Sequence, residues 1–200
     1  MSEKHTLHDL KEKEREARRE LILSAAARLF SQTHISKVGM RDIAKEAGIS
    51  PALIYRHFED RDELFVEVFF RQIEQMITAF EEAITESKVT SIEEVGHTFV
   101  TYLLDHDDFF QMMTYFMLDA VMNAKTIDSF NENIRKLLTL FDKSFAQHGM
   151  SEDVRIHSHA FFSALNGIVI TFRNYPGRTE EEIRKHITHL TQLMSSKFTN

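Results

Sequence analysis

The sequence predicts an all-α protein of about nine helices. Its 200 residues include only 2 prolines and 6 glycines, the two residue types that interrupt helices most strongly. Apolar side chains recur every three or four residues along most of the chain, which is the spacing of one helix face. No segment has a convincing strand pattern, and no repeat or low-complexity tract is evident.

The first clear helix is expected over residues 15–32. Two apolar stripes run side by side along it, formed by Leu21, Ala25 and Leu29 and by Ile22, Ala26 and Phe30. Residues 1–14 before it are polar apart from two leucines. They either extend this helix as a frayed end or form an arm that reaches a partner.

Two short helical segments follow, separated by a tight turn. The first covers residues 40–47, and Gly48 then stands where the backbone must adopt a positive φ, which glycine does at least cost. Ser50 is expected to cap the next helix through its hydroxyl, and Pro51 suits the first helical position. This order of cap, turn and helix predicts a helix-turn-helix.

A fourth helix is expected to begin near Asp60 and to continue to about Glu86. Asp60 and Glu63 have the spacing of a capping box, and the apolar pattern behind them is unbroken. The boundary between domains is therefore a continuous helix rather than a flexible linker. We place an amino-terminal domain at residues 1–62 and a larger helical domain at residues 63–200.

Five more helices complete the expected fold. Ser91 with Glu94 and Thr179 with Glu182 have capping-box spacing, and Gly149 and Pro176-Gly177 end two of the helices. The expected ranges are about 92–105, 109–123, 128–148, 151–174 and 180–197.

The helix-turn-helix predicts a surface that docks on duplex DNA. Leu53, Ile54 and Phe58 are candidates for the buried side of its second helix. The remaining side chains are free to meet the DNA, and cations beside them suit phosphates. The predicted DNA-binding residues are Lys37, Arg41, Pro51, Ala52, Tyr55, Arg56, His57 and Arg61.

Few of these residues can distinguish one base pair from another. Pro51 and Ala52 offer only apolar contact, such as with a thymine methyl group. Arg56 is the groove-side residue that can read guanine through two hydrogen bonds, unless it binds phosphate instead. An arm formed by residues 1–14 would add contacts to the backbone or minor groove.

At this point the chain resembles a known family. Residues 19–64 contain AA-x-x-LF at 25–30, IAKEAGIS at 43–50 and Y-x-x-F at 55–58, an ordered set similar to the amino-terminal domain of TetR-family transcriptional regulators. The resemblance implies a homodimeric repressor whose carboxy-terminal domain senses a small molecule. It also implies phosphate contacts for Tyr55 and His57, and for Arg61 at a position where a lysine is common.

Three positions depart from the pattern of that family. His34 stands where glycine is usual, so the turn after the first helix is expected to hold some strain. Gly39 replaces a serine or threonine near the start of the second helix, which removes a hydroxyl that would cap the helix or bind a phosphate. Leu53 stands where threonine is frequent.

Charge and composition exclude several classes of protein. The net charge is −7, yet residues 1–66 hold 12 cations and 12 acids, so that residues 67–200 carry the whole excess. This distribution fits a DNA-facing end joined to an acidic body. Without cysteine, a nucleotide-binding glycine loop, an HExxH motif or a nucleophile elbow, we expect neither an enzyme nor a cofactor. No apolar run approaches a membrane span, so a cytoplasmic protein is expected.

The middle helices are rich in aromatic residues and methionines, which together line adaptable apolar pockets or simply fill a core. The resemblance favours a pocket here, and because few basic residues lie nearby, an apolar or aromatic effector, neutral or cationic, is expected rather than a highly anionic one. Asp119 and Asn123 are further polar candidates. The predicted effector-binding residues are Phe99, Tyr102, Leu103, Met112, Met113, Phe116, Met117, Asn133 and Asn166.

The last two helices are unusually apolar for the end of a chain. The resemblance implies that they pair with their copies as a four-helix bundle, although an ordinary core within one chain explains part of the same pattern. Gly167 inside a helix favours close approach of another backbone. The predicted dimer interface comprises Phe161, Leu165, Ile168, Phe172, Ile187, Leu190 and Met194.

A metal site and two other functions also have to be considered. His186 and His189 lie three apart on one helix face, a spacing that suits a metal ion, but no metal is predicted without a supporting ligand pattern. Two functions are alternatives to a ligand-responsive regulator. The first is a DNA-binding protein without effector control, whose body serves only dimerisation. The second is a helical ligand carrier that merely contains a helix-turn-helix.

Overall fold

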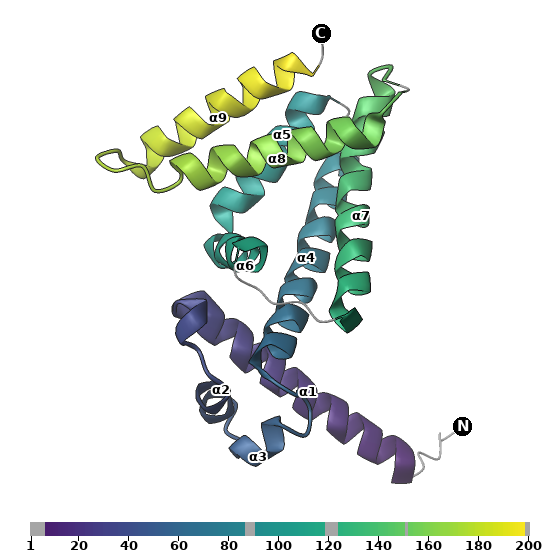
Figure 1. Ribbon diagram of the computed structural model, residues 1–200, viewed down its shortest axis with the longest axis vertical. Helices are drawn as coiled ribbons and strands as arrows, with labels where there is room; N and C mark the ends of the chain where they lie inside the picture. Colours follow the sequence, from purple (N-terminus) through teal and green to yellow (C-terminus); the bar gives the residue numbers. More distant parts are fainter. Residues whose placement is uncertain (1–6, 87–90, 119–123, 151, 199–200) are drawn as a thin grey trace. The chain divides into compact units, whose positions relative to one another are not determined.

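The structure is a computed structural model that describes residues 7–86, 91–118, 124–150 and 152–198. Throughout these ranges the regular structure is helical, with no strand, which confirms the predicted all-α fold. The helices, in chain order (Figure 1), are α1 (Leu7–Gln32), α2 (Met40–Glu46), α3 (Pro51–Ile54), α4 (Arg61–Glu86), α5 (Ile92–Asp105), α6 (Asp107–Leu118), α7 (Ala124–Gln147), α8 (Val154–Phe172) and α9 (Glu180–Lys197), with a 3-10 turn, η1 (Ile35–Lys37), before α2.

The chain divides into two compact units. The first comprises Met1–Arg71 with Gln111–Thr126, and the second comprises Gln72–Phe110 with Ile127–Asn200. The helix α4 passes from one unit to the other without a break, as the sequence predicts. The functional boundary that we place at residues 62 and 63 stays a prediction, since compactness alone puts the division within α4.

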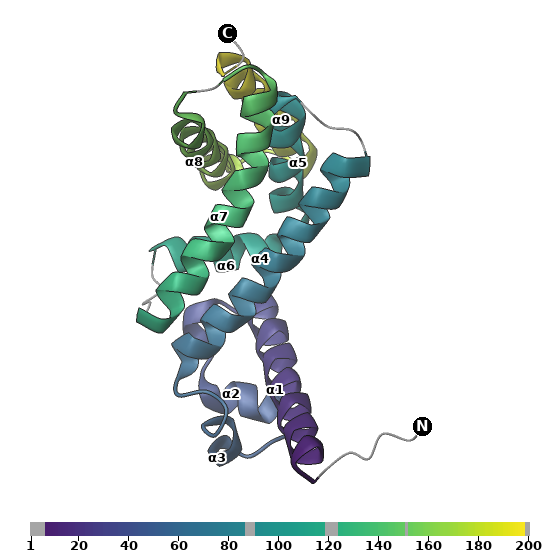
Figure 2. The same ribbon diagram turned by 90° about the vertical axis from the view of Figure 1, so that its right-hand side faces the viewer.

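The first unit packs α1, α2, α3 and the first turns of α4 around one apolar core. Ile22, Ile43, Ile54 and Phe65 are almost wholly buried there, so each of the four helices contributes to it. Figure 2 shows that α2 and α3 lie on the same side of α1. Burial of such side chains stabilises a fold by about 1.5–3 kcal/mol each, and this core sets the angle between α2 and α3.

The turn between α2 and α3 forms as the sequence predicts. Gly48 has φ +67°, and the Ile49 amide donates to the Ala44 carbonyl at 2.9 Å, which closes the end of α2. At the start of α2, the Asp42 carboxylate accepts from the Gly39 amide at 2.9 Å. A carboxylate inside the first turn therefore stabilises α2 despite the missing hydroxyl.

Several local expectations are wrong. Ser50 makes no side-chain cap for the short helix α3, which ends at Ile54, and the Leu53 amide that a cap would bond donates to the Ser50 carbonyl at 2.9 Å instead. His34 has φ −52°, so the turn after α1 uses an ordinary backbone conformation and stores no left-handed strain. Asp60 does accept from the Glu63 amide at 2.8 Å, but Glu63 bonds the amide of Glu59 rather than that of Asp60.

The second unit is built on α5, α8 and α9, which pack against one another (Figure 1). Gly96 of α5 marks the closest approach, because a Cβ placed on it would lie 2.7 Å from Cζ of Phe161 and 3.3 Å from Oγ of Ser195. The rings of Phe99 and Phe141 meet beside this point with centroids 5.5 Å apart. A glycine is therefore required where three helices cross.

Caps and charged bonds fix the ends of these helices. Ser91 and Thr179 form the predicted capping boxes with Glu94 and Glu182. Arg173, the residue after α8, donates to the Leu103 carbonyl near the end of α5 at 2.5 Å and pairs with Asp107 at the start of α6 at 2.6 Å. It thereby satisfies a carbonyl that the helix end would otherwise leave unpaired.

Most helix limits agree with the sequence within a few residues, and three differ. The helix α1 begins at Leu7, eight residues before its expected start at residue 15, so that residues 7–14 extend it. The helix α8 begins at Val154, after Asp153 with φ +52°, and the predicted start at Ser151 lies outside the described residues. The described part of α6 ends at Leu118, and the predictions for Asp119 and Asn123 likewise lie outside. No described helix is long and apolar enough to cross a membrane.

Candidate nucleic-acid interface

The exposed surface of α3 and the turn after it agrees with the predicted reading surface. Pro51, Ala52 and Arg56 are exposed, and 55% of Tyr55 is accessible. Ile54 and Phe58 are buried on the opposite side. The helix α3 therefore exposes two small apolar residues at its start, followed along the chain by the phenol of Tyr55 and the guanidinium of Arg56.

Free cations flank this surface. Lys37 in η1, Arg41 in α2 and Arg56 after α3 are exposed, and none has an ion-pair partner among the described residues. Lys45 is exposed on the outer side of α2. Unpaired cations retain their full charge for an incoming phosphate, since no internal ion pair has to break first.

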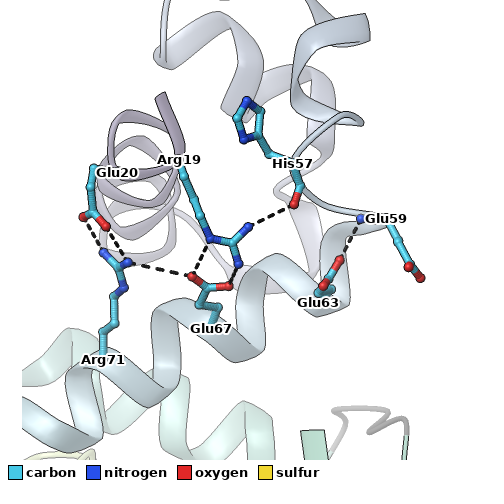
Figure 3. A network of polar contacts seen from close by, with 7 residues as sticks. All are labelled: Arg19, Glu20, His57, Glu59, Glu63, Glu67 and Arg71. Carbon is cyan, nitrogen blue, oxygen red and sulfur yellow. Dashed lines mark hydrogen bonds and ion pairs between the residues drawn. The ribbon is translucent and has the colours of Figure 1, made fainter. Parts of the chain in front are cut away.

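A charged network links the end of this reading segment to α1 and α4 (Figure 3). Arg19 of α1 donates to the His57 carbonyl at 3.0 Å and pairs through two nitrogens with Glu67 of α4. Its guanidinium also lies 4.3 Å from the ring centroid of Phe58. Arg19 therefore holds the backbone just after α3 to the two helices that support it.

Arg71 extends the network along α4. It bonds both carboxylate oxygens of Glu20 at 2.5 and 2.6 Å and lies 3.8 Å from Glu67. The hydrogen bonds from Arg71 lower the pKa of Glu20 below its usual value. Sequence reasoning missed Arg19 and Arg71, because partners 48 and 51 residues away in the chain have no local signal.

His57 lies at the centre of a positive region. Its carbonyl faces Arg19, whereas its imidazole points away from the network (Figure 3), and its Nδ1 is buried without a hydrogen-bond partner in the described chain. Burial lowers the pKa of His57, and the charges of Arg15, Arg19, Arg18 and Arg56 lower it further. An anion placed beside this ring would offset that repulsion.

Arg61, predicted to contact a phosphate, makes its hydrogen bonds within the protein. Its guanidinium donates to the Ile35 carbonyl at 3.2 Å, to Asp62 at 2.9 Å and to the Tyr115 hydroxyl at 2.5 Å. Tyr115 in turn packs edge-on against Phe65, with centroids 4.9 Å apart. Arg61 thus joins η1, α4 and α6 in the first unit, and in this conformation its donors are taken up by the protein rather than offered to a phosphate.

The predicted effector residues fall in both units. Met112, Met113 and Phe116 belong to the first unit and are at least 92% buried, whereas Met117 beside them is 46% exposed. In the second unit Phe99 and Leu103 are wholly buried, and Tyr102 stacks on His106 with centroids 3.9 Å apart. Burial places most of these side chains in cores.

The two predicted amide anchors have a distinctive environment. Asn133 of α7 and Asn166 of α8 are more than nine-tenths buried in the second unit. Each donates its Nδ2 to a carbonyl four residues earlier, that of Ser129 or Phe162. Each Oδ1 is buried without a donor in the described chain. Two acceptors left unsatisfied in one unit are costly, and a bound donor would relieve that cost.

The predicted dimer residues divide into two groups. Phe161, Leu165 and Ile187 are completely buried within the second unit, so they belong to the core of the protomer and are not accessible to a second copy. The other four are partly exposed: Ile168, Phe172, Leu190 and Met194. This burial matches the alternative that part of the apolar pattern is an ordinary core.

An outward stripe of apolar and small residues runs along α8. Ile156 and Ile170 are 63% and 48% exposed, and the small residues Ala160, Ser163 and Gly167 lie between them at helical spacing. A Cβ on Gly167 would meet no atom within 4 Å. Nothing within the described protomer therefore requires glycine at this position.

Residues 22–68 match the family of bacterial regulatory proteins known as the tetR family. Helix-turn-helix domains of transcriptional regulators have this arrangement, with an exposed second helix after a tight turn. Over these residues the chain is similar to the DNA-binding domain of the TetR family.

The curated relatives extend the likeness only over this domain. The HTH-type transcriptional regulator AcrR of Shigella flexneri is 45% identical over 51 residues, which cover 26% of this chain. The match spans about a quarter of the length of that relative, 24%. The likeness therefore concerns the DNA-binding domain.

Solved structures share the fold over most of the chain. The regulator FadR of Bacillus subtilis, in complex with stearoyl-CoA, has a TM-score of 0.66 at 18% identity, covering 88% of this chain and 97% of that one. A regulator from Saccharomonospora viridis, in complex with choline, has a TM-score of 0.67 at 19% identity, covering 86% and 93%. At such identities the likeness establishes the all-α fold and no more.

Proposed function

We propose that this protein is a dimeric, ligand-responsive transcriptional regulator that acts as a repressor in the cytoplasm. Its helix-turn-helix binds a palindromic operator, from which a small apolar or aromatic effector releases it. The observation that carries the proposal is the exposed face of α3, where Pro51, Ala52, Tyr55 and Arg56 face outward over a well-packed core. A side-chain arrangement of this kind fits the major groove.

The proposed DNA contacts follow from exposure and free charge. Lys37, Arg41, Tyr55 and His57 position the domain on phosphates, which contributes affinity without sequence preference. Pro51 and Ala52 make apolar contacts at the groove floor. Arg56 is the proposed reader of guanine. Arg61 is not assigned to a phosphate, because its donors serve Ile35, Asp62 and Tyr115.

We assign dimerisation to the outward stripe of α8 together with the partly exposed residues of α8 and α9. Ile156 and Ile170 would be buried by a second copy, and the bare backbone at Gly167 would let two helices approach closely. Two-fold pairing places two α3 helices on half-sites one helical turn apart, about 34–36 Å.

We place effector recognition in the second unit, where Asn133 and Asn166 have unsatisfied acceptors beside an aromatic core. Amide oxygens bind donors, so the effector is expected to present a hydroxyl, amine or ammonium group on an apolar or aromatic frame. The acidic excess of residues 67–200 favours a neutral or cationic molecule. The choline and stearoyl-CoA bound by the two similar structures belong to those proteins, and they illustrate how varied the ligands of this fold are.

Release from DNA is proposed to be a shift between two conformations of the dimer. On α6, Tyr115 lies between the predicted effector residues Met113 and Phe116 and bonds Arg61, which also holds the Ile35 carbonyl before α2. Movement of α6 would therefore pull on the segment that leads into the helix-turn-helix. An effector that binds one conformation ten times more tightly supplies about 1.4 kcal/mol toward this shift.

Binding of the purified protein to the DNA upstream of its own gene tests the proposal. Anisotropy of a labelled duplex should give an affinity that falls steeply as salt increases, because several phosphates are neutralised. A double variant, Tyr55→Ala with Arg56→Ala, should bind weakly while it keeps its helical circular dichroism. Absence of salt-dependent binding by the unaltered protein would contradict the proposal.

Two other functions are distinguished by further outcomes. A DNA-binding protein without effector control would bind the same duplex, but no small molecule would change its melting temperature or its affinity for DNA. A helical ligand carrier would bind an apolar amine without binding DNA. Thermal shift with a panel of aromatic and apolar amines, repeated with Asn133→Leu, separates these cases, because the variant lacks the proposed anchor.

A further inference from the structure

A basic groove lies between the early turns of α1 and the segment around α3. It encloses about 370 Å³ and is lined by Lys11, Glu14, Arg15, Arg18, Leu53, Arg56 and His57. Four of these side chains are cationic and one is acidic, although the whole chain carries a net charge of −7. The groove therefore concentrates positive charge beside the surface that we assign to DNA.

The cations of α1 share one face of the helix. Lys11, Arg15 and Arg18 are spaced four and three residues apart, so they point in nearly the same direction. The span from Lys11 to Arg18 is about 10 Å at 1.5 Å per residue. Lys11 and Arg15 have no ion-pair partner in the described chain, and Arg18 bonds Glu14 at 2.5 Å. Such a row suits a phosphodiester chain rather than one small anion.

These turns of α1 contribute nothing to the apolar core. Every buried residue of α1 lies at Ile22 or beyond, and Leu7 and Leu10 are 79% and 52% exposed. A solvent-exposed, charged extension gains little from burial and costs backbone entropy to order. Its packing role is thus small, and its basic face toward α3 calls for another explanation.

His57 is an independent indicator of the positive region. Its imidazole lies in the groove, its Nδ1 is buried without a partner in the described chain, and three of the four arginines that oppose its protonation are Arg15, Arg18 and Arg56 of the groove. Two elements far apart in the sequence therefore direct their cations to one point.

We propose that this groove is a second phosphate-binding surface, in which Lys11, Arg15 and Arg18 of α1 bind the DNA backbone next to the bases that α3 reads. The inference rests on the proposed function, since it assumes that α3 faces the major groove. Binding extends the footprint of each domain beyond the helix-turn-helix. It supplies affinity and not sequence preference, because phosphates are the same at every base pair.

A change at Glu14 should shift the affinity for DNA in the direction opposite to that of a change at the cations. It is the single acid of the groove, and its ion pair with Arg18 holds that cation back from the DNA. Removing its charge should strengthen binding, whereas removing a cation of the groove should weaken it. A role of these residues limited to helix stability would give no such inversion.

The experiment measures affinity against salt concentration for two labelled duplexes of equal length, one from upstream of the gene and one of random sequence. For each of Lys11→Ala and Arg15→Ala, the slope of log affinity against log salt should fall by about one. Affinity at about 50 mM salt should fall about tenfold, by the same factor on both duplexes. Glu14→Gln should raise affinity on both.

Lys13→Ala is the matched control, because it removes one cation from α1 at a position that does not line the groove. It should change the slope by much less than Lys11→Ala, and Arg15→Lys should keep most of the slope. Equal effects of Lys11→Ala and Lys13→Ala would overturn the proposal in favour of a general charge effect. If the wild-type protein binds its upstream DNA and the slopes of Lys11→Ala and Arg15→Ala equal the wild-type slope, the proposal is also overturned. If the wild-type protein does not bind that DNA, the proposed function itself is contradicted.

Discussion

At the scale of single residues, the side chains around α3 divide their tasks. Arg56 and Tyr55 are exposed and free to contact DNA, whereas Arg19 makes its contacts within the protein and positions the backbone after α3. His57 takes part in both tasks, because its carbonyl accepts a hydrogen bond from Arg19 and its side chain lines the basic groove. Recognition thus depends on residues that touch DNA and on residues that hold them in place.

Arg56→Ala and Tyr55→Phe should differ in kind. Loss of a bidentate contact to guanine costs about 1–3 kcal/mol and relaxes preference at one base pair, while loss of a phosphate contact weakens binding to all sequences alike. Affinities for an operator and for its single-base variants measure the difference. A uniform loss for Arg56→Ala would contradict its role as a base reader.

Arg19→Met should lower the free energy of unfolding by about 1–2 kcal/mol, because it removes hydrogen bonds to Glu67 and the His57 carbonyl but keeps an apolar stem beside Phe58. Arg28→Met is the control, since its ion pair with Glu46 is exposed and worth about 0–1 kcal/mol. Urea unfolding measures both. Equal losses would show that the Arg19 network has no special importance.

The lowered pKa of His57 predicts a pH effect on stability. In the unfolded chain a histidine takes up a proton near pH 6.5, but in the folded protein burial and Arg15, Arg18, Arg19 and Arg56 oppose this, with Lys11 and Glu14 also lining the groove. The unfolded chain therefore binds more protons, and unfolding becomes easier as pH falls below about 6.5.

The variant His57→Gln isolates this contribution from that of the other histidines. Its melting temperature relative to the unaltered protein should rise as pH is lowered from about 7 to 5, because the variant has no charge to bury at that position. A difference between the two proteins that stays constant with pH would contradict the assignment.

At the scale of elements, two glycines in helices have opposite surroundings. Gly96→Ala should destabilise the protein by about 1–3 kcal/mol, because its Cβ would press on the ring of Phe161 in a packed core. Gly167→Ala meets open space, so it should stabilise α8 in the protomer by up to about 1 kcal/mol.

The variant Gly167→Ala also tests the proposed dimer. If two copies pair closely at Gly167, Gly167→Ala should raise the dimer dissociation constant in analytical ultracentrifugation while the protomer stays folded. A dimer of unchanged affinity would exclude close backbone approach at this position. Thermal melts at low protein concentration check the stability of the protomer for both variants.

Local signals and distant contacts explain what the sequence could and could not predict. The capping pairs Ser91 with Glu94 and Thr179 with Glu182 are determined within one helix turn, and Gly48 needs only its own φ, so all were predictable. The Arg61 bonds and the groove beside α1 depend on partners dozens of residues away. Ser50 makes no side-chain cap although its residue type is right, because the Leu53 amide bonds the Ser50 carbonyl and the residue type alone does not decide between the two acceptors.

At the scale of the whole molecule, charge and chemistry are divided along the chain. The residues assigned to DNA contribute exposed cations in a neutral segment, whereas residues 67–200 carry the acidic excess and the buried acceptors of Asn133 and Asn166. The helix α4 runs through both compact units, and α6 also contributes to both. Continuous helices, rather than a flexible linker, therefore connect the proposed sensor to the proposed reader.

Selection from a random pool of duplex DNA tests the central claim most directly, because it requires DNA binding, dimerisation and base reading together. Repeated rounds of binding and amplification should enrich an inverted repeat whose half-site centres lie about one helical turn, 10–10.5 base pairs, apart or a multiple of that spacing. Arg56→Ala should yield the same spacing with one guanine position relaxed. Failure to enrich any sequence, or enrichment of a site without two-fold symmetry, would contradict a dimeric regulator that reads DNA through α3.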